Sequence, residues 1–354
     1  MPTTPYLGDD LTVKSVILPM YEPKLNTFNV YAALFSIIAK DESYLPWYYS
    51  NFISLGINTC DDTLYFTDHF TFFEYGDGLS SCPWLEVYKP PHKTIYYEYI
   101  FRIKDTLIGY LNQNKYVWLY LDQFYIPQSN SYQKIHKEHS ILVYGYDDEA
   151  NIFYIADNLD NGKFIKTMIS YQQLIEAWES DICEHFRRLF RVINFKEGEY
   201  KLNTTHLKNQ IEGYLSSNII NNGVYWDQNP IDGPHAYAQN IKYWIFGHEV
   251  YSYMRQLIKQ VKETKDTKNL DIRIPHLLWE HKKCMVERIN YLNLRVYDFY
   301  SDYEKIVNSS LNIRNLTIKY NMTKNDSILD KIDTIISEVV NTEEIALRKL
   351  VKLL

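Results

Sequence analysis

Residues 121–157 read LDQFYIPQSNSYQKIHKEHSILVYGYDDEANIFYIAD. An apolar segment that suits a strand buried on both faces, Tyr116–Leu121, leads into it. Two further strand-like segments flank the turn Asp147–Ala150, namely His139–Tyr146 and Ile152–Asp157. The pattern therefore predicts a central strand followed by a β-hairpin.

The hairpin carries a histidine near one end and a carboxylate near the other. If a three-residue loop closes it, His139 lies opposite Asp157, and a slip of one residue would put the two side chains on opposite faces. A carboxylate beside an imidazole can fix its tautomer and stabilise its charged form, as in a nucleophile–base–orienter triad. The alternative is a polar pair in a hairpin without a catalytic role.

Composition and charge narrow the class of protein. The chain has 354 residues, 46% hydrophobic and 23% charged, as in soluble globular proteins, and its length favours two domains of about 150 residues each. A net charge of −7 argues against nucleic acid as a partner. No apolar run reaches about 18 residues, and no signal peptide is evident, so we expect no membrane span and a cytoplasmic location. Four scattered cysteines without a CxxC motif predict free thiols.

The pattern changes near residue 198. Residues 1–198 mix strands and helices and predict a domain with a mainly antiparallel sheet, whereas residues 199–354 predict an all-helical domain. The expected fold class is therefore α+β. The helices predicted in the second part cover residues 203–217, 235–263, 275–308 and 326–353.

The first helix offers a place for a nucleophile. The run LNTFNVYAALFSIIAKD, residues 25–41, predicts a buried helix that begins at about Thr27, with Asn26 or Thr27 as N-cap. A helix N-terminus stabilises an anion, so a catalytic thiolate would suit this position. Thr27 occupies it instead. Its hydroxyl is far less acidic than a thiol, whose pKa is about 8.5 before any tuning.

Metal and cofactor sites are not indicated. His136 and His139 are three residues apart and could share a metal with Asp122 or Asp157, but no third and fourth ligands stand at a recognisable spacing. No glycine-rich phosphate loop and no GxSxG elbow is present. We therefore expect neither a metal nor a cofactor.

The order of these elements resembles the papain-like cysteine peptidase fold. In that order, a helix begins at the nucleophile position, a strand opens with histidine, and its partner strand ends in aspartate. More closely, residues 12–195 resemble its C39-like branch beside nonribosomal peptide and aminoglycoside assembly lines, which includes butirosin-type acyltransferases and enzymes of the closthioamide type. The run that carries the resemblance is D-x-F/Y-Y-x-P, Y-x-K-x-H-x-x-H, GYD and D. It is matched here by Asp122, Phe124, Tyr125, Pro127, Tyr132, Lys134, His136, His139, Gly145, Tyr146, Asp147 and Asp157.

The resemblance implies roles for particular residues. It implies a catalytic triad at Thr27, His139 and Asp157; an oxyanion or supporting role for Asn26, Asp122 and His136; and substrate contacts for Tyr125 and Tyr132. The chain departs from the family at the nucleophile, because Asn26-Thr27 stands where the family has Asn-Cys. This threonine is either a natural loss or an engineered replacement.

The resemblance also implies an activity: transfer of an acyl group from a carrier-protein thioester to an amine or diamine, which forms an amide in secondary metabolite biosynthesis. The acidic hairpin would favour a cationic amine, and the basic stretches at residues 259–268 and 281–283 would suit an acidic carrier protein or are solvated helix surface. The sequence does not decide whether the helical part forms a homodimer. The alternatives are a non-catalytic binding protein for a carrier-bound acyl chain and a cysteine peptidase.

Overall fold

The structure, a computed structural model, describes residues 14–67, 78–218, 241–264 and 269–354. Contacts divide the chain into two compact units. Unit 1 comprises residues 1–40 and 84–197, and unit 2 comprises residues 41–83 and 198–354. The predicted α+β class is confirmed, since an antiparallel sheet in the first part of the chain is followed by long helices.

The units do not follow the chain as two successive stretches. The later boundary falls at Gly198, within one residue of the predicted change in pattern. Residues 41–83, however, belong with the C-terminal helices and not with the strands that surround them in sequence. The division into domains of residues 1–198 and 199–354 stays a prediction.

Unit 1 is built on an antiparallel sheet. Its strand order is β4-β9-β5-β6-β7-β8, and β1 pairs with the last residues of β6, beyond the start of β5. The strands are β1 (Ser15–Ile17), β4 (Leu85–Tyr88), β5 (Lys115–Asp122), β6 (Glu138–Asp147), β7 (Ile152–Asp160), β8 (Lys163–Ser170) and β9 (Arg191–Phe195). The apolar strand expected to be central, β5, is indeed central and almost wholly buried.

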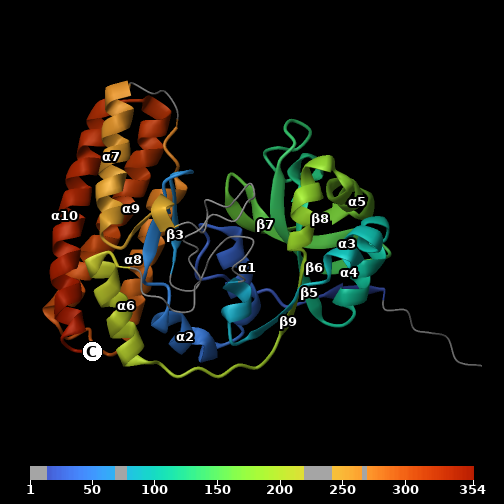
Figure 1. Ribbon diagram of the computed structural model, residues 1–354, viewed down its shortest axis with the longest axis horizontal. Helices are drawn as coiled ribbons and strands as arrows, with labels where there is room; N and C mark the ends of the chain where they lie inside the picture. The colour runs from blue at the N-terminus through green and yellow to red at the C-terminus, as the bar shows by residue number, and fades with distance from the viewer. Residues whose placement is uncertain (1–13, 68–77, 219–240, 265–268) are drawn as a thin grey trace, which may run out of the picture. The chain divides into compact units, whose positions relative to one another are not determined.

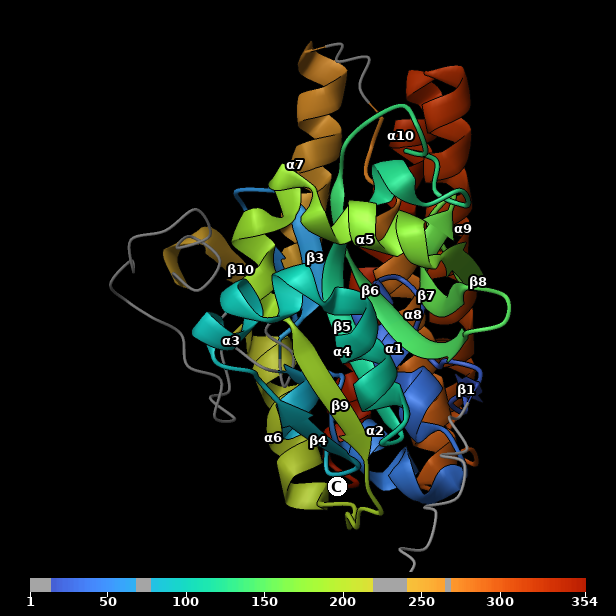
Figure 2. The ribbon, with the colours of Figure 1, turned by 90° about the vertical axis from the view of Figure 1, so that its right-hand side faces the viewer.

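Helices cover both faces of this sheet. The helix α1 (Asn29–Ile38) packs on β6 and β7, while α4 (Ile103–Leu111) and α5 (Tyr171–Glu179) pack on β5 from the other side (Figures 1 and 2). The short α3 (His92–Tyr97) precedes α4. Ser170 caps α5 in a capping box with Gln173, because each side chain bonds the other residue's backbone amide.

The start of α1 differs from the prediction. The helix begins at Asn29, two residues later than expected, and its N-cap is Phe28, which has no capping side chain. Neither Asn26 nor Thr27 is therefore the N-cap, and both lie in the segment before the helix. The residues that follow are apolar and buried at nearly every position, so α1 is a core helix.

The register of the β6–β7 hairpin also differs from the prediction. Asp147 pairs with Ile152, so the loop has four residues, not three. A β-bulge between Val143 and Gly145 then shifts the pairing by one, and Val143 lies opposite Ile155. Continued by two residues, this register places Ile141, not His139, opposite Asp157. His139 is a diagonal neighbour on the same face.

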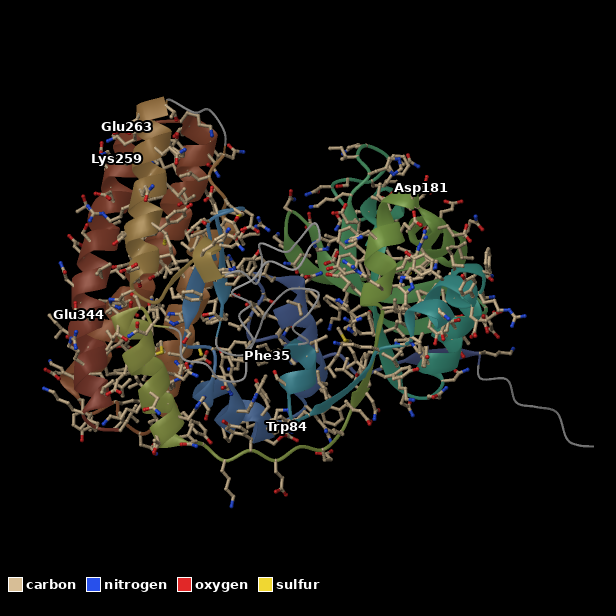
Figure 3. All side chains as sticks on the ribbon, viewed as in Figure 1. Phe35, Trp84, Asp181, Lys259, Glu263 and Glu344 are labelled. Atoms are coloured by element: carbon tan, nitrogen blue, oxygen red, sulfur yellow. The ribbon has the colours of Figure 1, made fainter. Side chains whose placement is uncertain are left out.

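Unit 2 combines helices with a small sheet. The helices are α2 (Leu45–Ser50), α6 (Thr204–Ser216), α7 (Glu249–Thr264), α8 (Arg273–Tyr291), α9 (Asp298–Thr323) and α10 (Asp326–Val351). The last four run side by side (Figure 1), and the outer face of α7 carries Lys259 and Glu263, which form an ion pair at 3.6 Å (Figure 3). Three antiparallel strands pack with them in the order β10 (Trp244–Phe246), β2 (Leu55–Asn58), β3 (Thr63–Phe66).

Two of the four predicted C-terminal helices match α6 and α10 within two residues. The single helix predicted over residues 275–308 is wrong, because α8 ends at Tyr291 and α9 begins at Asp298. The helix predicted over residues 235–263 is wrong in its first part. Residues 235–240 lie outside the described residues, and residues 244–246 form β10.

One of the basic stretches lies largely inside unit 2. His281 and Lys282 are fully buried, and Lys282 Nζ contacts Glu343 Oε1 at 2.7 Å. The hydroxyls of three tyrosines also donate to Glu343, namely Tyr214, Tyr251 and Tyr303. The prediction that residues 281–283 form a docking surface or a solvated face is therefore wrong for the first two residues. They link α8 to the neighbouring helices instead.

A helix that crosses a bilayer needs about 20 consecutive, mainly apolar residues. Among the described residues, no helix is long and apolar enough to cross a membrane.

Candidate active site

The side chains of His139 and Asp157 meet in unit 1. His139 Nδ1 lies 2.8 Å from Asp157 Oδ2; the Asp157 side chain is fully buried, whereas that of His139 is 28% exposed. A carboxylate only accepts hydrogen bonds, so Nδ1 is the donor and the lone pair stays on Nε2. An imidazole in this tautomer can act as a general base through Nε2.

Three further groups hold the carboxylate of Asp157. The side-chain amide of Asn29, in the first turn of α1, donates to Oδ1 at 2.9 Å. The side-chain amide of Gln123 donates to Oδ2 at 3.2 Å, and the backbone amide of Asn158 donates to Oδ1 at 2.6 Å. With His139 included, four donors surround this carboxylate, which is the arrangement that a buried charge requires.

The segment before α1 is attached to the same strand. Asn158 directs its side-chain amide to the carbonyl oxygens of Asn26 and Thr27, at 3.1 and 3.3 Å. Asn29 lies two residues further along and also approaches His139 Nδ1, at 3.4 Å. The structure therefore brings the predicted nucleophile position, Thr27, to the end of β7 that carries Asp157. Thr27 is 8% exposed.

Asp122 and His136 form a second pair. His136 Nδ1 lies 2.6 Å from Asp122 Oδ2, which also accepts from Ser180 Oγ at 2.8 Å. Burial would raise the pKa of Asp122, but hydrogen bonds from His136, the Phe124 amide, Ser180 and the Lys137 amide together hold it below its usual value.

The second pair lies on the other face of the sheet. Leu121 is the cross-strand partner of His139, and side chains alternate along a strand, so Asp122 points away from the side that carries His139. Its contact with Ser180, just after α5, agrees with this placement. We therefore find no direct contact of Asp122 or His136 with His139 or Asp157 among the interactions of the described residues, and the supporting role stays a prediction.

The two tyrosines expected to contact substrate lie in the loop between β5 and β6. Tyr125 is half-buried, and its ring meets the His136 ring edge-on at 6.2 Å. Tyr132 is also half-buried, and its hydroxyl accepts from the exposed Gln133. Tyr125 thus belongs with the second pair, and a substrate contact for either residue stays a prediction.

Sequence reasoning missed three residues of this site: Asn29, Gln123 and Asn158. Each carries a side-chain amide, and each lies within two residues of a predicted site residue, namely Thr27, Asp122 or Asp157. A buried triad needs donors for the outer oxygens of its carboxylate. Amide residues beside the expected triad members are therefore the signal that could have found them.

No cysteine of unit 1 can replace Thr27 as a ready nucleophile. Cys183 is the one cysteine in the sequence of this unit, and it is fully buried. Burial raises the pKa of its thiol to about 12, and the charge of Asp122 adds to the shift. Within the described parts of the chain, no group of three or more His, Cys, Asp or Glu could hold a metal ion.

The fold and the site together define an α+β protein in which a strand-borne histidine and a buried aspartate lie beside the start of a core helix. Residues 102–158 match the family model described as butirosin biosynthesis protein H, N-terminal. A comparison with curated proteins found no match. The family match agrees with the butirosin-type part of the predicted resemblance and covers His139 and Asp157, but not Thr27.

Proposed function

We propose that this chain has the site of an acyltransferase of secondary metabolite biosynthesis, with position 27 as the nucleophile position. The observation that carries the proposal is the His139–Asp157 hydrogen bond of 2.8 Å, on a strand whose next residue, Asn158, binds the backbone at Asn26 and Thr27. The family match over residues 102–158 supports acyl transfer over other uses of such a pair.

In the proposed reaction, a cysteine at position 27 gives its proton to His139 Nε2 and attacks the carbonyl carbon of an acyl thioester. The carrier thiol leaves with that proton, and Asp157 stabilises the imidazolium in between. Backbone N–H groups at the start of α1 would bind the oxyanion. An amine then attacks the acyl-cysteine, and His139 takes a proton from the amine nitrogen. As the C–S bond breaks and the amide forms, His139 passes this proton to the cysteine sulfur, which regenerates the thiol and the neutral imidazole.

Thr27 makes the present chain a weak catalyst in this scheme. Its hydroxyl is far less acidic than a thiol, and the methyl group restricts χ1. The hydrogen bonds that hold Asp157 support the proposal nevertheless, because both oxygens of its carboxylate have donors. A carrier protein as acyl donor and a diamine as acceptor remain part of the proposal. The acidic residues of the hairpin give little support for a cationic amine as acceptor, because Asp157 is buried and Glu149 forms an ion pair with Lys14.

The test is the replacement Thr27→Cys. We expect this variant, mixed with a small acyl thioester, to gain the mass of the acyl group on the new thiol at position 27, and an added diamine to release the amide. The same variant with His139→Ala should acylate at least tenfold more slowly, because general-base catalysis contributes about 10²–10⁴. If the folded Thr27→Cys protein forms no acyl-enzyme, the acyltransferase proposal fails.

The binding-protein alternative gives a different result. A non-catalytic protein that grips a carrier-bound acyl chain would bind the acylated carrier with Thr27 in place and would not turn over after Thr27→Cys. A cysteine peptidase would cleave peptides in the Thr27→Cys form and show no preference for amines over water.

A further inference from the structure

The loop that joins β5 to β6, residues 123–137, is closed at both ends by one carboxylate. Asp122 Oδ1 accepts from the backbone amides of Phe124 and Lys137, both at 3.0 Å. The backbone amide of Gln123 completes the closure by donating to the Lys137 carbonyl at 2.8 Å. The first residue of the loop, Gln123, is therefore fixed by main-chain bonds.

The side chain of Gln123 is fixed as well. It is 4% exposed, and its carbonyl oxygen accepts from Ser129 Oγ at 3.2 Å. Ser129 is itself buried, and its oxygen accepts from the Ser131 amide at 3.0 Å. An amide whose oxygen is engaged by a hydroxyl must direct its N–H groups the other way. Here they point at Asp157 Oδ2, at 3.2 Å.

Asp157 Oδ2 is also the atom that accepts from His139 Nδ1. A carboxylate rotates easily about χ2 unless its oxygens are held. Asn29 and the Asn158 amide hold Oδ1, whereas Gln123 is the residue that shares Oδ2 with the histidine. We propose that Gln123 is a positioning residue, which the closed loop presents to Asp157 so that this carboxylate keeps His139 in the Nδ1–H tautomer. An effect of Gln123 on catalysis rests on the proposed function, whereas its effect on the tautomer of His139 does not.

The test uses Gln123→Met, which keeps the length of the side chain and removes its donor and acceptor. Gln128→Met is the matched control, because Gln128 is an exposed residue of the same loop. In full-length protein with ¹⁵N-labelled histidine and Thr27 in place, ring ¹⁵N shifts report which nitrogen carries the proton. The His139→Gln variant assigns the signal. We expect the Nδ1–H of His139 to exchange with water about tenfold faster in Gln123→Met and to be unchanged in Gln128→Met.

A second variant replaces the donor by an acceptor. Gln123→Glu has the same shape, but at pH 8 it places a carboxylate against Asp157, so the hydrogen bond is lost and the two charges repel. If Gln123 holds Asp157, the Nδ1–H of His139 is lost or exchanges faster in this variant, as in the uncharged Gln123→Met, which alone separates the lost hydrogen bond from packing and charge. Ser129→Ala keeps Gln123 and should give a smaller change in the same direction.

Activity provides a second readout. In the Thr27→Cys background, Gln123→Met should lower kcat for acyl transfer about tenfold with KM for the thioester unchanged, since a hydrogen bond to a charged group is lost away from substrate. If the His139 ring in Gln123→Met is the same as in the control Gln128→Met, the positioning role is refuted, whatever the charge in Gln123→Glu does to the ring. If the ring changes but Thr27→Cys forms no acyl-enzyme, the positioning role stands and the proposed function fails.

Discussion

At the scale of single residues, two buried carboxylates of unit 1 each hold a histidine through its Nδ1, Asp157 at 2.8 Å and Asp122 at 2.6 Å. His139 and Asp157 lie on strands, where the alternation of side chains makes a shared face predictable. His136 lies in a loop of irregular backbone, so nothing in its spacing from Asp122 indicated a contact. For the same reason, the amide of Gln123 could not be assigned to Asp157 from the sequence, although it lies next to a predicted strand end.

Asp122 should make unit 1 sensitive to acid. Its pKa in the folded chain lies below the usual value, so its carboxylate stabilises the fold above about pH 4 and loses this contribution as the pH falls through the folded-state pKa. Asp122→Asn should therefore cost about 1–3 kcal/mol at pH 7 and progressively less below pH 4. Urea unfolding across this pH range measures the difference.

A control for Asp122→Asn is Asp181→Asn, since Asp181 is exposed on the same unit (Figure 3). We expect the free energy of unfolding of this variant to stay within about 0.5 kcal/mol of the parent at pH 7. A constant gap between Asp122→Asn and the parent from pH 7 to pH 2 would contradict the assigned role of the carboxylate.

At the scale of elements, the β6–β7 hairpin explains why His139 and Asp157 meet although the register predicted for the two strands is wrong. Near the turn the pairing is displaced by three residues from the predicted one, which would put His139 and Asp157 on opposite faces. The bulge between Val143 and Gly145 reduces the displacement to two, and the two side chains share a face again. The strands and the turn are visible in the sequence, but nothing in it indicated the bulge.

Gly145, at this bulge, should not tolerate a side chain. A Cβ there would lie 2.5 Å from the Val16 carbonyl oxygen and 3.1 Å from Ile17 Cα, both on the backbone of β1. We expect Gly145→Ala to displace β1 and to lower the free energy of unfolding by about 1–3 kcal/mol. Gly109→Ala is the control: a Cβ at this position in α4 meets nothing within 4 Å, and the change should stabilise by about 0.5–1 kcal/mol. Equal effects of the two substitutions would refute the crowding argument.

At the scale of the whole molecule, each compact unit combines two stretches that are separate in the sequence. The side chain of Arg288, fully buried in α8, donates to the carbonyl oxygens of Tyr49 and Asn51, both at 2.7 Å. His281, also in α8, contacts the Ile53 carbonyl at 2.8 Å. Backbone carbonyls at the end of α2 and just after it are thus satisfied by side chains that come more than 220 residues later in the chain. Composition along the sequence cannot predict such long-range pairing, because residues 41–83 resemble their neighbours in their mixture of strand and helix.

This discontinuity predicts how the chain responds to being cut at the change of pattern near residue 198. In a fragment of residues 1–198, β2 has lost its partner β10, and the carbonyls at Tyr49 and Asn51 have lost Arg288. Buried carbonyls without donors and bare apolar strands are costly, so we expect this fragment to aggregate or to unfold without a cooperative transition. Co-expression with residues 199–354 should restore a soluble complex in which the amides of β2 are protected from hydrogen exchange. If residues 1–198 alone unfold cooperatively and protect those amides, then α8 is not what holds residues 41–83, and the two successive domains expected from the sequence describe the folding of the chain better than the two compact units do.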